Sequence, residues 1–222
     1  MEPGEIGVLT GPVLAASDAF DIEIKGKGGH AALQELCIDP ILTTSHLVGA
    51  LKSLVNSQTN ALEAEVVTVT QIHAGDAYNV IPDSIRLCRS IRTFKSEIRE
   101  NIHSGMKRVA ERVAEGFGAK AILTIKRGCR STINSKVESI RAASAGGKVV
   151  VKERVILDTL CSIGSEDFSL ILQALPICYI WLGNGNRDGG CFHHNPHYEF
   201  NDKILPIGAS FWISLIEQEL PL

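Results

Sequence analysis

Residues 20–25, FDIEIK, alternate apolar and charged side chains along their whole length. Strict alternation of this kind predicts a β-strand that buries only one of its faces. Three further segments also favour strands and two segments have helical spacing; the strands are expected at 65–72, 85–91 and 121–125, and the helices at 40–56 and 96–115. The order β-α-β-β-α-β over residues 20–126 is that of the ferredoxin-like unit, one antiparallel sheet with two helices on one face.

Residue types at the helix ends support this order. Asp39 precedes Pro40, which is the pattern of an N-cap followed by proline at the first helical position. Ser96 is expected to cap the second helix, and Gly116 and Gly118 to end it. The buried side of the first helix is expected to carry four apolar residues, Ile41, Val48, Leu51 and Val55.

The pattern changes after Gly128. Residues 177–182 are apolar throughout, which favours a strand covered on both faces, as in a parallel α/β sheet. Ser165 is expected to cap a helix with Phe168, Ile171, Leu172 and Leu175 on its buried side, and Pro206 to open a last helix. One or two strands are too few for a sheet that needs covering on both sides. We therefore expect a compact α+β insert at 17–128 between two pieces of an incomplete α/β domain, at 1–16 and 129–222.

Composition excludes several classes of protein. The 222 residues carry a net charge of −3 with no cluster of Lys and Arg, so nucleic acid and anionic membranes are poor partners. No apolar run reaches the roughly 18 residues of a membrane span, and the first residues lack the order of a signal peptide. The six cysteines form no C-x-x-C pair, which favours reduced thiols. A cytoplasmic protein is the expectation.

The strongest chemical signal is the stretch CFHHNPH at 191–197, which places three histidines within five residues. Imidazole is the commonest protein ligand of metal ions, but a catalytic zinc-type site needs about three protein ligands. His30 follows two glycines that let backbone approach a ligand closely, although a surface histidine in a turn fits equally well. Asn79 lies in a turn before a strand, and Arg92 lies in a strand, where its guanidinium needs an anion. The acidic pair Glu166 and Asp167 fits a helix start.

Seven short motifs occur in order over nearly the whole chain: KGKGGHAA at 25–32, IDP at 38–40, IHAG at 72–75, NVIPDS at 79–84, IRTF at 91–94, GSEDF at 164–168 and HHNP at 193–196. Together they resemble the M20 family of metallo-amidohydrolases. The branch of greatest similarity is that of hippurate hydrolase and the auxin-conjugate (N-acyl-amino-acid) hydrolases.

The resemblance implies an α/β catalytic domain, here at 1–16 and 129–222, with an inserted α+β dimerisation or lid domain at 17–128 that forms a homodimer. It implies that His194 binds metal, and that His30 reaches the active site of the partner subunit and stabilises the oxyanion. Asn79 and Arg92 would hold the free carboxylate of an N-acyl amino acid. Two divalent ions (Zn, Mn or similar) per complete site would activate the water that cleaves the amide, while His193 and His197 would not bind metal.

One departure from the family pattern matters. The family's other metal ligands and its general-base glutamate lie N-terminal to the lid, and no residue here matches them. We therefore expect the isolated chain to be an inactive C-terminal part of a hippurate-like amidohydrolase. A non-catalytic dimerisation module, or a gene remnant, is the alternative, and simple metal binding at 191–197 is a third interpretation.

Overall fold

The computed structural model describes residues 1–58, 66–185 and 194–220, with backbone alone for 55–58. Within these ranges the chain divides into two compact units. The inserted unit comprises Ala15–Ser131 and Ile163–Glu166, and the flanking unit comprises Met1–Leu14, Thr132–Ser162 and Asp167–Leu222.

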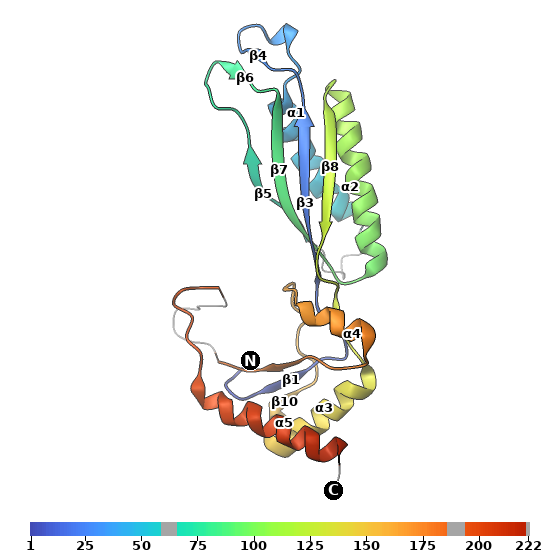
Figure 1. Cartoon of the computed structure of the whole chain (residues 1–222), viewed down its shortest axis with the longest axis vertical. Coiled ribbons are helices and arrows are strands. Elements are labelled where there is room, and N and C mark those ends of the chain that lie inside the picture. Colours follow the sequence, from blue (N-terminus) through green and yellow to red (C-terminus); the bar gives the residue numbers. More distant parts are fainter. Residues whose placement is uncertain (59–65, 186–193, 221–222) are drawn as a thin grey trace. The chain divides into compact units, whose positions relative to one another are not determined.

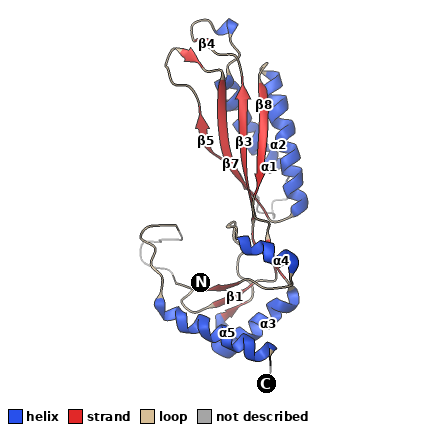
Figure 2. Ribbon diagram, in the orientation of Figure 1, coloured by secondary structure: helices blue, strands red, loops and turns tan. Residues whose placement is uncertain are grey.

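The inserted unit is built on one antiparallel sheet of four strands, β3 (Ala16–Lys25), β5 (Val66–His73), β7 (Ser84–Thr93) and β8 (Lys120–Arg127). The strand order is β5-β7-β3-β8, as Figure 1 shows. Helices α1 (Pro40–Gln58) and α2 (Ser96–Gly116) contact each other on one face of this sheet (Figure 2). The prediction of a ferredoxin-like arrangement is thus confirmed.

The alternation at 20–25 explains which face of the sheet is buried against the helices. Phe20, Ile22 and Ile24 are buried beneath the helices, and the intervening Asp21 and Glu23 lie on the open face. The opposite strand β7 repeats the pattern with Ile85, Leu87 and Ile91, and the helices contribute Leu47, Leu51, Ile102 and Met106. Full burial of one such side chain contributes about 1.5–3 kcal/mol.

The helix starts differ in one respect from the sequence expectation. Asp39 does cap α1, because its Oδ1 atom accepts hydrogen bonds from the N–H groups of Ile41 at 2.7 Å and Leu42 at 3.3 Å. Ser96 is instead the first residue of α2, and the capping position is Lys95, with no side-chain bond. Ile41 is exposed, so its expected place on the buried side of α1 was wrong, because the buried stripe runs through Thr43, Leu47 and Leu51 at intervals of four residues and position 41 lies off it. The side chain of Val55 lies outside the described residues.

The flanking unit contains two small sheets. Strand β1 (Ile6–Val8) pairs in parallel with β10 (Val155–Ile156) and antiparallel with β11 (Ile180–Leu182), and β2 (Gly11–Leu14) pairs with β9 (Thr132–Asn134). Helices α3 (Lys136–Val149) and α5 (Leu205–Glu219) contact each other beside β1. The small core is formed by five buried residues, Ile6, Val8, Ala142, Ala145 and Phe211. Residues 1–16, in which the sequence shows no clear period, thus supply two complete strands.

Short elements complete the fold. In the inserted unit these are β4 (Gly29–His30), β6 (Val80–Ile81) and the 3-10 turn η1 (Gln34–Leu36); in the flanking unit they are η2 (Lys152–Arg154), η3 (Asp167–Leu170), α4 (Ile171–Ala174) and η4 (Asp202–Ile204). No helix in the described part of the chain is both long and apolar enough to cross a membrane.

Two expectations for the C-terminal part were wrong. The helix expected after Ser165 is reduced to η3 and α4, with Ile171 and Leu175 exposed. Leu175 is extended because it precedes Pro176, and the residue before proline avoids the helical region. The strand expected at 177–182 is β11 alone and is antiparallel to its neighbour. At Tyr179 the Asn134 side chain takes the place of a neighbouring strand, because it bonds both the N–H at 2.7 Å and the carbonyl at 2.8 Å.

Candidate functional site

The glycine turn before β4 is clamped on two sides. The Lys27 N–H donates to the Ile38 carbonyl at 2.9 Å, and the Ile38 N–H returns a bond of 2.9 Å to Lys27. A Cβ atom on Gly26 would lie 2.1 Å from the Ile38 carbonyl oxygen, and one on Gly28 would lie 2.5 Å from the Ile81 carbonyl oxygen. Glycine is required at both positions because backbone lies where a side chain would begin.

This turn places His30 next to Asn79. His30 is paired with Val80 between β4 and β6, and the Ala31 N–H donates to the Asn79 carbonyl at 3.0 Å. The Ala32 N–H donates to His30 Nδ1 at 3.1 Å, so the neutral ring carries its proton on Nε2. Figure 1 shows β4 and β6 together beyond the ends of the long strands. Both side chains are exposed there, and His30 can act as a hydrogen-bond donor.

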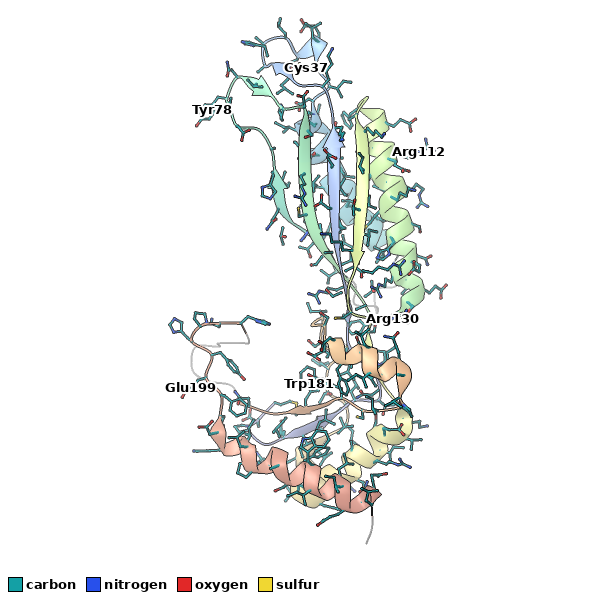
Figure 3. All side chains as sticks on the ribbon, viewed as in Figure 1. Cys37, Tyr78, Arg112, Arg130, Trp181 and Glu199 are labelled. Atoms are coloured by element: carbon teal, nitrogen blue, oxygen red, sulfur yellow. The ribbon has the colours of Figure 1, made fainter. Side chains whose placement is uncertain are left out.

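A pocket of about 500 Å³ opens on the same hairpin. It is lined by residues 73–77, 80 and 82–84, which belong to the connection from β5 to β7. Tyr78, labelled in Figure 3, extends from this connection and is fully exposed. The pocket therefore borders the loop that carries Asn79, and it could receive part of a ligand held there.

Arg92 lies at the other end of β7. It pairs with Ser17 on β3 and Val66 on β5, and its Nη1 donates to the Ser165 hydroxyl at 2.7 Å. Arg92 lies eight positions after Ser84, where β7 begins, which corresponds to about 26 Å of strand. Of the three inserted-unit residues predicted for the site, the structure brings together His30 and Asn79 but not Arg92.

A buried ion pair lies near the Arg92 end of the sheet. Asp18 is 2% exposed, and its carboxylate accepts hydrogen bonds from Arg99 Nε at 2.7 Å, from the Gly128 N–H at 2.9 Å and from the second nitrogen of Arg99. His103 Nε2 lies 2.8 Å from the same carboxylate. Burial acts to raise the pKa of Asp18, but the hydrogen bonds and charge of Arg99 outweigh it, so that this pKa lies below its ordinary value. The cluster joins β3, α2 and the end of β8, which is a structural role.

His194 belongs to the flanking unit and has an unusual backbone. Its φ angle is +66°, the one positive value for a non-glycine residue in the described ranges. Asn195 folds the following turn, since its side chain accepts the His197 N–H at 2.8 Å and its carbonyl accepts the Tyr198 N–H at 2.9 Å. Such backbone strain persists where the surrounding chain imposes it, often at functional sites. Cys191 and His193 lie outside the described residues.

The candidate ligands described above do not by themselves form a metal centre. Across the described ranges there is no group of three or more His, Cys, Asp or Glu side chains that could hold an ion. His194 and His197 are both exposed. The described residues therefore do not fit a complete metal centre, which needs about three protein ligands.

Two hydrogen bonds near the predicted site residues were missed from the sequence. Asp83 belongs to the motif at 79–84 but had no predicted role, and its carboxylate accepts a hydrogen bond from the Gly28 N–H in the glycine turn. Ser165 was expected to cap a helix, and it accepts a hydrogen bond from Arg92 instead. Both pairs are far apart in the chain, 55 and 73 residues, so no local pattern could reveal them.

Comparisons with known proteins agree with these features. Residues 16–118 match the family model described as the peptidase dimerisation domain. The chain is 34% identical over 219 residues to N-acetylcysteine deacetylase of Bacillus subtilis (strain 168), covering 96% of this chain and 54% of that protein. It is 33% identical over 224 residues to the IAA-amino acid hydrolase ILR1-like 4 of Arabidopsis thaliana, covering 98% and 50%. A solved structure of the Bacillus subtilis YXEP protein, described as a dinuclear metal binding peptidase from the M20 family, superposes with a TM-score of 0.80 at 28% identity and covers 99% of this chain and 54% of that one.

Residues 16–118 are a dimerisation domain of the M20 peptidases. The resemblance inferred from the seven motifs is thereby confirmed. The chain spans about half the length of the curated relatives it matches. These relatives are named as a deacetylase, an amino acid hydrolase and a dinuclear metal binding peptidase.

Proposed function

We propose that this chain is the lid and C-terminal part of a metal-dependent amidohydrolase that cleaves the amide bond of N-acyl amino acids, with hippurate-like substrates. The observation that carries the proposal is the placement of His30 beside Asn79 on the β4–β6 hairpin. Two relatives, named as an N-acetylcysteine deacetylase and an IAA-amino acid hydrolase, support this class of substrate.

His30 is the proposed catalytic residue of this part. Its Nε2–H can donate to the amide carbonyl oxygen as negative charge develops there during attack by water. The Ala32 N–H keeps this proton on the outward nitrogen, so the ring needs no change of tautomer before reaction. Asn79, the residue directly before β6, would bind the free carboxylate of the substrate through its amide N–H groups.

Arg92 is the second proposed carboxylate-binding residue, and its distance from Asn79 requires a dimer. About 26 Å of strand exceeds the length of a small N-acyl amino acid, so one copy cannot bring both residues to one substrate. In a homodimer, His30 and Asn79 of one copy and Arg92 of its partner would act together. The Ser165 hydroxyl uses one of five guanidinium N–H donors, which leaves a fork for a carboxylate.

The side of the lid that forms this dimer is inferred from charge. Helix α1 carries one Lys and no Asp, Glu or Arg. Helix α2 instead exposes seven charged side chains, Glu97, Glu100, Lys107, Arg108, Glu111, Arg112 and Glu115, and Arg112 is seen pointing away from the helix in Figure 3. Interface cores are depleted of charge, and an unpaired strand edge is a natural place for a second copy to add. We therefore assign the dimer to α1 and the neighbouring edge strand β5.

The metal part of the proposal is limited to His194, which would supply one ligand. Divalent ions, two in a complete site, would activate the attacking water when they are bound. Because the described residues do not form a complete centre, we expect the isolated chain to be inactive. The absence of a described centre also favours a second candidate, a non-catalytic dimerisation module. A cytoplasmic location remains a prediction.

The test separates these candidates. The purified chain is assayed for hippurate hydrolysis with added Mn²⁺ or Zn²⁺, alone and mixed with a fragment of the Bacillus subtilis relative that covers the part outside the match. We expect no turnover alone, turnover in the mixture, and its loss in a His30→Ala chain. Turnover by the chain alone would refute the expected inactivity. A mixture that remains inactive while the chain sediments as a dimer would support the module instead.

A further inference from the structure

One carboxylate lies directly against the turn that carries His30. Asp83 lies between β6 and β7, and its Oδ1 atom accepts a hydrogen bond of 2.9 Å from the Gly28 N–H. Its main-chain carbonyl accepts a second bond, of 2.8 Å, from the Gly26 N–H. A single residue therefore holds two of the glycines that precede His30, one through its side chain and one through its backbone.

We propose that Asp83 is a positioning residue, whose carboxylate holds His30 beside Asn79 by fixing the glycine turn. The proposal rests on the function proposed for His30. Gly28 lies only two residues before His30, so the bond from Asp83 restrains the chain just as it enters β4. The backbone bond at Gly26 continues the β3–β7 ladder, and the carboxylate extends this support past the ends of both strands.

The hairpin needs such an anchor because it is very small. Strands β4 and β6 have two residues each and share two pairs, Gly29 with Ile81 and His30 with Val80. An isolated two-stranded ribbon is marginally stable in water, even when it is longer than this. A contact from the rigid end of the four-stranded sheet therefore has a large effect on where the hairpin lies.

The shape of the turn suits a carboxylate at this position. A Cβ atom on Gly28 would lie 3.0 Å from the Asp83 nitrogen, in addition to its clash with the Ile81 carbonyl. The absence of a side chain lets the Gly28 N–H come within reach of the short Asp side chain. An ionised oxygen forms a stronger hydrogen bond with this N–H than a neutral oxygen does.

The effect is transmitted to the imidazole through consecutive backbone groups. The Gly28 bond is followed by the Ala31 N–H bond to the Asn79 carbonyl and by the Ala32 N–H bond to His30 Nδ1. Loosening the first bond lets the turn move, and the next two then lose their alignment. The Nε2–H group would point in a less defined direction relative to Asn79.

Amide hydrogen exchange on the whole ¹⁵N-labelled chain tests this series of hydrogen bonds. In Asp83→Ala we expect exchange at Gly28 and Ala31 to accelerate about threefold to tenfold, the range of one net hydrogen bond. Asp83→Asn keeps an acceptor oxygen and should recover part of the protection. Asp76→Ala, at an exposed carboxylate in the same connection, should change neither amide. Exchange at Ile22 and Leu87 in the buried sheet should stay unchanged in all three variants.

The ring itself supplies a second measurement. The ¹⁵N signals of neutral His30 should report the Nε2–H form in the wild-type chain, and a shift toward a mixture of tautomers in Asp83→Ala. If exchange became faster at Gly28 but stayed unchanged at Ala31, and the ring signals also stayed unchanged, the proposal would be overturned, because Asp83 would then act on the turn alone. Acceleration throughout the sheet would overturn it as well. None of these readings requires activity, so a His30→Ala chain that retains hydrolysis in the mixture would refute the proposed function and leave the result on Asp83 intact.

Discussion

Replacing Arg99 by Met tests whether the buried pair with Asp18 holds the inserted unit together. Asp18 and Arg99 are 2% and 6% exposed, and the substitution leaves the carboxylate with the Gly128 N–H and His103 as partners. Removing one member of a buried pair costs about 3–5 kcal/mol, because the remaining charge stays out of water. Since two partners remain here, we expect a loss of about 3 kcal/mol at neutral pH.

Native-state amide exchange at Ile22 and Leu87 measures this loss, since both lie in the core of the inserted unit and exchange when it opens. The matched control is Arg127→Met, which breaks an exposed pair with Glu100 and should have a much smaller effect. Because the pKa of Asp18 is lowered on folding, its contribution is complete above its ordinary value near 3.8 and is lost as pH falls through the folded pKa. The stability of the wild-type unit should therefore fall more steeply than that of the variant below about pH 4. Equal losses for Arg99→Met and Arg127→Met would refute the structural role of the cluster.

Three other substitutions test separate parts of the chain. Asn134→Ala removes both hydrogen bonds to the part-buried backbone of Tyr179. We expect a loss of about 3 kcal/mol by tryptophan fluorescence in urea, and a loss below about 1 kcal/mol would contradict this role. Phe211→Ala opens a cavity in the small core of the flanking unit and should cost about 3–5 kcal/mol in the same assay; no change in the urea midpoint would show that the core is formed elsewhere. Leu42→Glu places a charge on the exposed side of α1 and should raise the dimer dissociation constant at least tenfold by sedimentation, whereas Arg112→Glu on α2 should not; the reverse result would assign the dimer to α2.

The inserted unit was predictable because its burial follows local periodicity. The alternation at 20–25 fixes which face of β3 is buried, and Asp39 before Pro40 fixes where α1 begins. Only the first turn of α1 was misjudged, because Ile41 is as apolar as Leu47 and packing against the sheet alone distinguishes them. Sequence periodicity gives the period of a helix more reliably than its rotation.

The candidate site shows a different limit. His30 and Asn79 are 49 positions apart in the chain, and their proximity depends on a two-residue hairpin that no pattern of hydrophobicity predicts. Arg92 lies only 13 positions after Asn79, yet the length of β7 places it at the far end of the sheet. The motifs indicated the family resemblance. Strand length and register, which the motifs do not encode, determine which of their residues lie close together.

The flanking unit was less predictable for a reason that is itself structural. Its core cluster contains five buried residues, against thirteen in the inserted unit, counted over the described ranges. Helix α5 is apolar on its outer side as well, where Trp212, Ile213 and Ile216 are each more than half exposed. A helix that is apolar on all sides is ordinarily covered on all sides. Side chains on such a surface carry no periodic signal of which face turns inward, because both faces have the composition of a core. Local patterning therefore predicts the unit that completes its own core and fails for the unit that leaves much of its apolar surface uncovered.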